Sequence, residues 1–193
     1  TVYGGIAGDV MGRDIRNMGA LRDPDETVLA AEIDRATRPF SKPAGLVQPL
    51  RQKLQEAMWE DVGVMRTESK LRRGIDEVDA IRAELMETGV SADNLAFNLT
   101  WHDWLNLASL CDISEVIARA ALWRENSRGA HYREDFPDEG DLENSYFTVA
   151  RRDGDSDSDN GVSVTRAPVQ FTIVRPGETI LPEGEPETLV AAQ

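Results

Sequence analysis

Residues 124–137 read Arg124-Glu125-Asn126-Ser127-Arg128-Gly129-Ala130-His131-Tyr132-Arg133-Glu134-Asp135-Phe136-Pro137. This stretch, the arginine motif, holds three arginines, three carboxylates and one of the chain's two histidines. It comes directly after a long apolar run with helical spacing. No other stretch of the chain is as chemically dense, and the predicted helices and strands are arranged around it.

The apolar run predicts a helix over residues 101–127, with Thr100 as its N-cap. Its apolar side chains go nearly all the way round the helix: Trp104, Leu105, Leu107, Leu110, Ile113, Val116, Ile117, Ala120 and Trp123. A helix that is apolar on all sides must be covered on most of them. We therefore expect this helix at the centre of the fold.

Two amphipathic helices precede the central one. The first is predicted over residues 46–62, and the second begins after Thr67. Gly74 in the second helix should permit close packing against a neighbour. The second helix carries a buried stripe at helical spacing, made of Leu71, Ile75, Val78 and Leu85. Together the three helices predict a mainly α fold, an antiparallel three-helix bundle with short connecting loops.

The N-terminal region leaves two interpretations open. Apolar residues of the first sixteen positions recur at helical spacing with no capping residue ahead of Val2, which predicts a helix whose start lies upstream. Four glycines among them are as consistent with a loose segment. Further on, Asp23 and Pro24 predict a helix start, and the helix should continue to about Arg38.

The sequence changes character beyond Pro137. Residues 146–149 and 162–165 alternate like the strands of a hairpin, and residues 169–174 read as a further strand. The aspartate-rich segment 153–159 resembles a calcium loop but lacks the glycine and glutamate that such a loop needs, so a solvated hairpin loop is favoured. Residues 176–193, rich in Pro, Glu and Gly, predict a tail.

The composition of the chain disfavours several classes of partner. The 193 residues suit one domain, or one domain with an extension, and carry 35 acidic against 21 basic side chains for a net charge of −14. Such a charge disfavours nucleic acid and anionic membrane surfaces. No apolar run approaches the length of a membrane span, and the N-terminus does not read as a leader. Cys111, set among apolar residues, is predicted in the core, which fits a reducing cytoplasm.

The residues alone leave two roles for the arginine motif. Guanidinium groups bind dicarboxylates or phosphates bidentately, so the motif could be an anion site. Alternatively, Arg128 and Arg133 form a structural knot with Glu134 or Asp135 and with helix-end carbonyls, while Gly129 reverses the chain.

Nothing in the sequence predicts a catalytic, cofactor-binding or metal site in this chain. It contains no nucleophile with an adjacent base and no GxGxxG phosphate loop. Two histidines and one cysteine make a transition-metal site hard to assemble. His102 and Asp103 are better explained as the first turn of the central helix, where an acidic residue is favourable.

Several segments resemble, in order, the succinate dehydrogenase and fumarate reductase flavoprotein family, with L-aspartate oxidase as a relative. The most specific likeness is Ser127-Arg128-Gly129-Ala130-His131-Tyr132-Arg133-Glu134-Asp135-Phe136-Pro137. Residues 2–8 resemble the helix after the family's His-Gly-Ala-Asn-Arg-Leu-Gly-Gly-Asn segment, 58–67 its first C-terminal helix and turn, and 106–121 its central helix. Asn126 departs from the family's usual Glu, which puts in doubt any salt bridge borrowed for that position.

The resemblance implies an FAD-dependent oxidoreductase that oxidises succinate, or reduces fumarate or a related dicarboxylate, and passes electrons to an iron–sulfur subunit. The family's flavin-binding and substrate-binding residues lie upstream of Thr1, so FAD is expected on the parent protein and this chain should not turn over alone. Residues 1–45 would then be trailing helices of the FAD-binding domain and their connection. Residues 46–137 would be a spectrin-repeat-like C-terminal bundle, 138–175 a β-hairpin extension and 176–193 a tail.

Within that family, the motif is expected to support the active site from behind or to form an interface, through Ser127, Arg128, Gly129, His131, Arg133 and Asp135. Expected partners are the upstream FAD-binding domain, an iron–sulfur subunit and, through the parent, the dicarboxylate. The location would be cytoplasmic, with membrane association only through partner subunits. The alternative is a stand-alone helical binding or scaffold module without catalytic activity.

Overall fold

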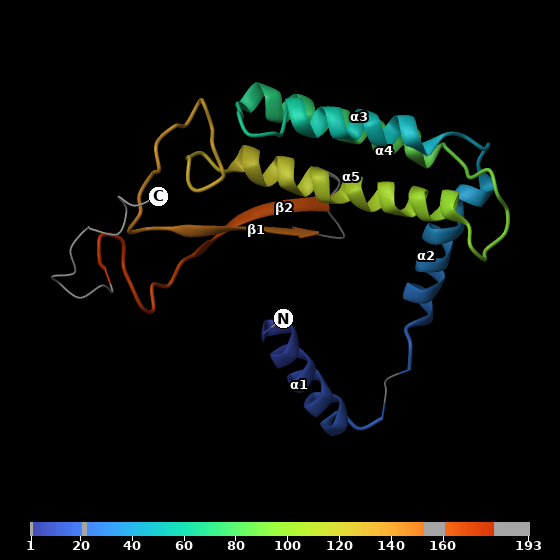
Figure 1. Cartoon of the computed structure of the whole chain (residues 1–193), viewed down its shortest axis with the longest axis horizontal. Helices are drawn as coiled ribbons and strands as arrows, with labels where there is room; N and C mark the ends of the chain where they lie inside the picture. Colours follow the sequence, from blue (N-terminus) through green and yellow to red (C-terminus); the bar gives the residue numbers. More distant parts are fainter. Residues whose placement is uncertain (1, 21–22, 153–160, 180–193) are drawn as a thin grey trace, which may run out of the picture. The chain divides into compact units, whose positions relative to one another are not determined.

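The computed structural model describes residues 2–20, 23–152 and 161–179, and these are mainly helical (Figure 1). Its elements in chain order are α1 (Val2–Asn17), α2 (Glu26–Thr37), the 3-10 helix η1 (Arg38–Ser41), α3 (Val47–Glu60), α4 (Glu68–Met86), α5 (Leu99–Trp123), β1 (Tyr146–Arg152) and β2 (Val162–Pro168). The chain divides into two compact units, Thr1–Arg38 and Pro39–Gln193. In the described part of the chain, none of the helices has the length and apolar character needed to cross a membrane.

The first unit consists of α1 and α2. The helical interpretation of the N-terminal region is confirmed, since α1 begins at Val2. Helix α2 begins later than predicted, because its N-cap is Asp25 and not Asp23. The Asp25 carboxylate accepts hydrogen bonds from both the amide and the hydroxyl of Thr27, at 2.9 and 2.6 Å. That second donor favours Asp25 over Asp23 as the cap.

The second unit is built on α3, α4 and α5, which pack against one another and run in alternating directions (Figure 1). The largest core cluster takes side chains from all three helices, namely Leu50, Leu54, Val78, Ile81, Leu85, Trp104, Leu107 and Cys111. A smaller cluster lies toward the arginine motif and contains Val62, Leu71, Ile75, Ala118 and Ala121. All four residues of the predicted α4 stripe are buried, and so is Cys111.

Both ends of α4 are closed by side-chain hydrogen bonds. Thr67 caps the N-terminus as predicted and accepts from the amide of Lys70. At the other end the indole of Trp104 donates to the carbonyls of Leu85 and Thr88, at 3.1 and 2.9 Å. The Leu85 carbonyl also accepts from the amide of Thr88 at 3.0 Å, so the indole adds a second donor at this helix end.

Gly74 confirms the expectation of close packing inside α4. A Cβ atom at this position would lie 2.7 Å from Cγ2 of Val62 and 3.2 Å from Cβ of Asp61. The turn after α3 therefore rests directly on the backbone of α4, and any larger residue at position 74 would push the two apart.

Helix α5 is displaced from its predicted bounds at both ends. Its N-cap is Asn98, so the predicted cap at Thr100 is wrong. The buried Asn98 amide accepts from the amide of Trp101 and donates to the carbonyls of Ala92 and Asn94. The Thr100 hydroxyl only donates to Asn98. Tertiary contacts of Asn98 to the preceding loop thus decide where the helix begins.

Among the described residues of the second unit, α5 is covered on fewer sides than predicted. Leu110, Ile113 and Ile117 form an exposed apolar stripe, with Ile113 59% exposed. The buried face instead includes small and polar residues, among them Ser114, Glu115 and Ala118.

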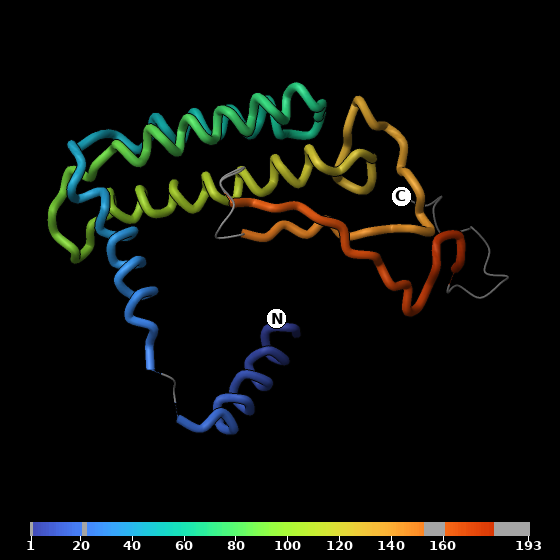
Figure 2. The backbone as a smooth tube through the Cα atoms, turned by 180° about the vertical axis from the view of Figure 1, so that it is seen from behind, coloured from blue at the N-terminus to red at the C-terminus, as the bar shows by residue number. Residues whose placement is uncertain are grey.

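The predicted β-hairpin is confirmed, with β1 and β2 paired antiparallel from Tyr146 opposite Pro168 to Arg152 opposite Val162. It lies beside α5, as the backbone in Figure 2 also shows. The strand predicted over residues 169–174 is absent from the described structure; only the amide of Val169 extends the ladder, to the carbonyl of Ser145. Residues 153–160 and 180–193, which carry the aspartate-rich loop and most of the tail, lie outside the described residues.

The core assignment predicts which leucine of α5 matters for stability. Leu107 is fully buried and Leu99 is 76% exposed on the same helix. Leu107→Ala should lower the free energy of unfolding by about 2–5 kcal/mol by leaving a cavity. Leu99→Ala should change it by no more than about 0.5 kcal/mol. Urea unfolding followed by circular dichroism measures both, and equal losses in the two variants would contradict the assignment.

Candidate functional site

Arg133 lies at the centre of the arginine motif, with only 1% of its surface exposed. Its Nη1 donates to the carbonyls of Ala121, Leu122 and Arg124, at 3.1, 2.9 and 3.4 Å. These are among the last carbonyls of α5, which have no partner within the helix. The guanidinium therefore closes α5 from outside, and the helix ends at Trp123 instead of continuing to residue 127 as predicted.

Asp135 accepts the remaining hydrogen bonds of the Arg133 guanidinium. Its two carboxylate oxygens accept from Nε and Nη2 of Arg133, both at 2.7 Å. Oδ2 also accepts from the amide of Glu68 at 2.8 Å, so the carboxylate bonds the N-terminus of α4. The hydrogen bonds from Arg133, helped by the Glu68 amide, lower the pKa of Asp135 to about 2. One ion pair thus joins the end of α5 to the start of α4.

Ser127 and Gly129 shape the loop that carries Arg133. The Ser127 hydroxyl accepts from the amide of Arg133 at 2.9 Å and donates to the carbonyl of Phe136 at 2.7 Å. Arg128 and His131 exchange backbone hydrogen bonds across a tight reversal. Gly129 sits in that reversal at a φ of +59°. Its left-handed backbone is the conformation that glycine adopts at no steric cost, as the predicted reversal requires.

His131 is held in one tautomer by its two neighbours. Nδ1 lies 2.9 Å from Nη1 of Arg66, and Nε2 lies 3.3 Å from the carbonyl of Arg124. Because a guanidinium can only donate, Nδ1 must accept and Nε2 must carry the proton. Burial, together with the charges of Arg66, Arg124 and Arg133, lowers the pKa of His131. A neutral histidine with both nitrogens occupied is therefore a structural link.

Arg128 differs from its predicted pairing. Its guanidinium donates to the carbonyls of Glu139 and Asp141, at 2.8 and 3.1 Å, and to the hydroxyl of Ser145 at 2.8 Å. It therefore fastens the loop before β1, whereas the expected partners Glu134 and Asp135 lie elsewhere. The structure brings all six predicted residues together: Ser127, Arg128, His131, Arg133 and Asp135 form one hydrogen-bonded knot, and Gly129 occupies the reversal between Arg128 and His131.

Glu115 is a buried charge that the sequence analysis missed. It is 2% exposed and lies between Arg82 and Arg119, at 2.6 and 2.8 Å. An acidic residue among apolar neighbours in a helix, with an arginine four positions later, is the signal that could have found it. Burying a carboxylate costs free energy, and Glu115 is tolerated inside the fold because both arginines compensate its charge.

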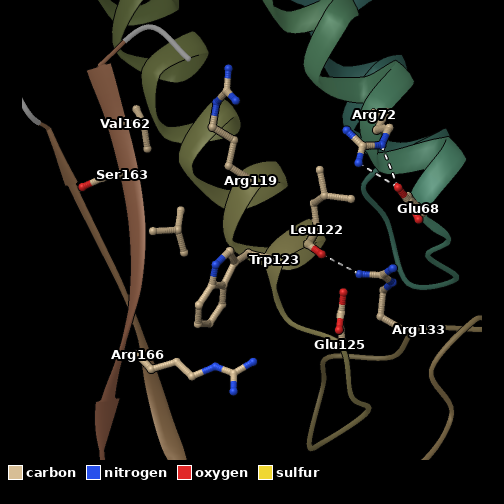
Figure 3. Close-up of a pocket in the computed structure, with 11 residues that line it drawn as sticks. Glu68, Arg72, Arg119, Leu122, Trp123, Glu125, Arg133, Val162, Ser163 and Arg166 are labelled. Carbon is tan, nitrogen blue, oxygen red and sulfur yellow. Dashed lines mark hydrogen bonds and ion pairs between the residues drawn. The ribbon is translucent and has the colours of Figure 1, made fainter. Parts of the chain in front are cut away.

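A cavity of about 630 Å³ lies beside the motif, between the first turns of α4, the last turns of α5 and strand β2 (Figure 3). Arg133 forms part of its wall, and Figure 3 shows this side chain turned toward Leu122. In the described part of the chain, no three His, Cys, Asp or Glu side chains come together as metal ligands. The residues of the arginine motif thus hold the fold together, and the cavity beside them is lined by several arginines.

Known proteins match most of this second unit. The family described as the C-terminal part of fumarate reductase flavoproteins matches residues 51–181. A succinate dehydrogenase flavoprotein subunit of Coxiella burnetii is 34% identical over 134 residues, which cover 68% of this chain and 22% of that protein. A fumarate reductase flavoprotein subunit of Mycobacterium tuberculosis is 26% identical over 78% of this chain and 25% of its own length. The chain thus spans about a quarter or less of these relatives.

The fold also matches solved structures. Adenylylsulfate reductase from Archaeoglobus fulgidus superposes with a TM-score of 0.71 at 18% identity, covering 88% of this chain and 28% of that chain. At such identity the likeness concerns the fold alone.

The knot predicts that its arginines stabilise the chain itself. Arg133→Met should cost about 3–5 kcal/mol, because it leaves Asp135 and the α5 carbonyls without their partner. Arg128→Ala should cost about 1–3 kcal/mol through its loop carbonyls. Arg72, whose ion pair with Glu68 is solvent-exposed, is the control, and Arg72→Ala should be near neutral. Denaturant midpoints measure all three; a loss for Arg133→Met no larger than for Arg72→Ala would refute the knot.

The lowered pKa of Asp135 predicts a pH dependence. The pKa of this carboxyl is about 2 in the folded chain and about 3.9 when unfolded. Its ionised form therefore stabilises the fold above about pH 4, and the contribution disappears as the pH falls toward 2. The stability gap between the unchanged chain and Asp135→Asn, measured by urea unfolding, should be full at neutral pH and narrow in that acidic window. A gap that stays constant would show that Asp135 acts through its shape and not its charge.

Proposed function

Because the chain belongs to the family of fumarate reductase flavoprotein C-terminal domains, we propose that it acts as the C-terminal domain of an FAD-dependent oxidoreductase. The proposed reaction is the oxidation of succinate or the reduction of fumarate or a related dicarboxylate. The observation that carries the proposal is the extent of the family match, which runs from α3 through the arginine motif and the hairpin to residue 181.

We propose four parts for the chain. Residues 1–45 would be trailing helices of the FAD-binding domain and their connection, 46–137 a spectrin-repeat-like antiparallel three-helix bundle, 138–175 a hairpin extension and 176–193 a tail. The exposure of the first two helices supports the first assignment: neither α1 nor α2 buries a side chain, and α1 exposes Val2, Tyr3, Ile6, Met11 and Ile15. Helices with such apolar faces are stable when another body covers them.

The proposed role of the six knot residues is to support the flavin domain or to form an interface, without contacting the reacting atoms. The bonding of Arg133 supports this view, since all of its nitrogens donate to carbonyls or to Asp135 inside the chain. FAD would be held by the FAD-binding domain. An iron–sulfur subunit would accept or supply electrons, in the cytoplasm, with any membrane association made through partner subunits.

A second candidate, a stand-alone helical binding module, is favoured by one observation. The stripe of Leu110, Ile113 and Ile117 on α5 is exposed in the second unit, as the docking face of such a module would be.

The two candidates differ in what the native protein carries. The protein that contains this sequence should be purified from its source through a C-terminal tag, and its visible spectrum and its fumarate-dependent oxidation of reduced viologen measured. We expect bound flavin and turnover. The 193-residue chain, as the matched control, should show neither after mixing with FAD and gel filtration, because it has no phosphate-binding glycine loop.

Two outcomes would contradict the proposal. A native protein without flavin and without fumarate-dependent turnover would favour the stand-alone module. A 193-residue chain that stays yellow after gel filtration would place a flavin site inside it and overturn the assignment of FAD to another domain.

A further inference from the structure

The cavity beside the arginine motif has the size and walls of a small-molecule site. Its volume of about 630 Å³ lies within the range of about 300–1,000 Å³ that is usual for ligand pockets. Leu122, Trp123, Val162 and Val164 give it an apolar wall. Val162 and Val164 share one face of β2 with Arg166, because alternate residues of a strand point the same way.

Among the residues that the structure describes, the charges around this cavity are not balanced. Four arginines line it, and three of them have carboxylate partners: Arg72 pairs with Glu68, Arg119 with Glu115, and Arg133 with Asp135. Arg166 is the exception. Among the described residues its guanidinium contacts only the rings of Trp123 and Tyr146, at 4.9 and 4.5 Å from their centroids.

A second arginine strengthens the positive charge at this place. Arg124 lies 5.0 Å from the centroid of the same Tyr146 ring. Its hydrogen bonds go to Asn126, to the carbonyl of Tyr146 and to the hydroxyl of Thr148, none of which is charged. Two guanidinium groups therefore share one aromatic ring, and neither pairs with a carboxylate of the described residues, in a chain whose net charge is −14.

Glu125 partly neutralises the positive charge of Arg124 and Arg166. It lines the same cavity, and no described residue bonds or pairs with its carboxylate. It offsets one positive charge, which leaves a single net positive charge from Arg124, Arg166 and Glu125. This local field would favour an anion and would be increased by removing Glu125.

We propose that the cavity binds a small organic anion, through a carboxylate or phosphate group on Arg166 and an apolar body on the wall of Trp123, Val162 and Val164. Figure 3 shows Arg166 reaching from β2 toward Trp123, where such a group would meet both. The planar guanidinium binds carboxylate and phosphate oxygens bidentately, and its present contacts with aromatic rings leave that edge available. The proposal does not rest on the proposed oxidoreductase function, because it uses only groups of this chain.

The test is a titration of the ¹⁵N-labelled chain with benzoate and with phenyl phosphate, followed through the backbone amides of residues 119–125 and 162–166. These probes share a flat apolar body and differ in the acidic group, so they distinguish a carboxylate from a phosphate ligand. Acetate and inorganic phosphate lack the body and should bind more weakly. Raising the salt concentration should weaken binding, because the Arg166 contact is partly exposed to solvent.

Three variants are expected to differ in their affinity for the probes. Arg166→Gln should weaken binding about tenfold, as expected for the loss of a charge-assisted hydrogen-bond pair. Glu125→Gln should strengthen it. Arg151→Gln is the matched control, because Arg151 lies on the partner strand β1 and does not line this cavity, and it should have no effect. The amide spectrum of each variant also reports whether it remains folded.

The proposal would be overturned by any of three results: no saturable shift with either probe, shifts confined to other parts of the chain, or equal binding of the neutral analogue benzamide. Unchanged affinity in both Arg166→Gln and Glu125→Gln would likewise exclude an anion site at this cavity.

Discussion

The ion pair between Arg133 and Asp135 is the interaction on which the second unit depends. The side chain of Arg133 is 1% exposed, and such a buried charge is tolerated only when its N–H groups all have hydrogen-bond acceptors. Arg133 meets this condition with the carbonyls that end α5, and Asp135 meets it with the amide that begins α4. Glu134 adds a backbone bond to Arg66 in the α3–α4 turn. The ion pair and this neighbouring backbone bond together hold the end of α5 against the start of α4 and the turn before it.

Local sequence patterns predicted the parts of the fold that local physics controls. The stripe of α4 and its cap at Thr67 follow from helical spacing and from the chemistry of the first turn. Gly74 was identified because only a glycine in a helix interior suggests close approach. The hairpin strands were found from their alternation.

Predictions failed where the bounds or the burial of an element depend on residues distant in sequence. The end of α5 depends on Arg133, which lies ten positions beyond Trp123. The helix begins after Asn98 and not after Thr100, because carbonyls of the preceding loop bind the Asn98 side chain. The apolar periphery of α5 did not reveal that Ile113 would be exposed while Glu115 is buried between two arginines. For the site, the pairing of Arg133 with Asp135 and with helix-end carbonyls could be predicted from the sequence. The partners of Arg128 could not, because its guanidinium bonds to the loop before β1.

The bond from Asp135 to the amide of Glu68 spans 67 residues, and this separation has a consequence during translation. At about 5–20 residues per second, a ribosome needs on the order of 3–13 s to reach Asp135 after it has made Glu68. Throughout that interval α4 is present without its second N-terminal acceptor, and α5 emerges without the guanidinium that closes it. Until Asp135 has left the ribosomal tunnel, α4 and α5 therefore lack the ion pair that joins them.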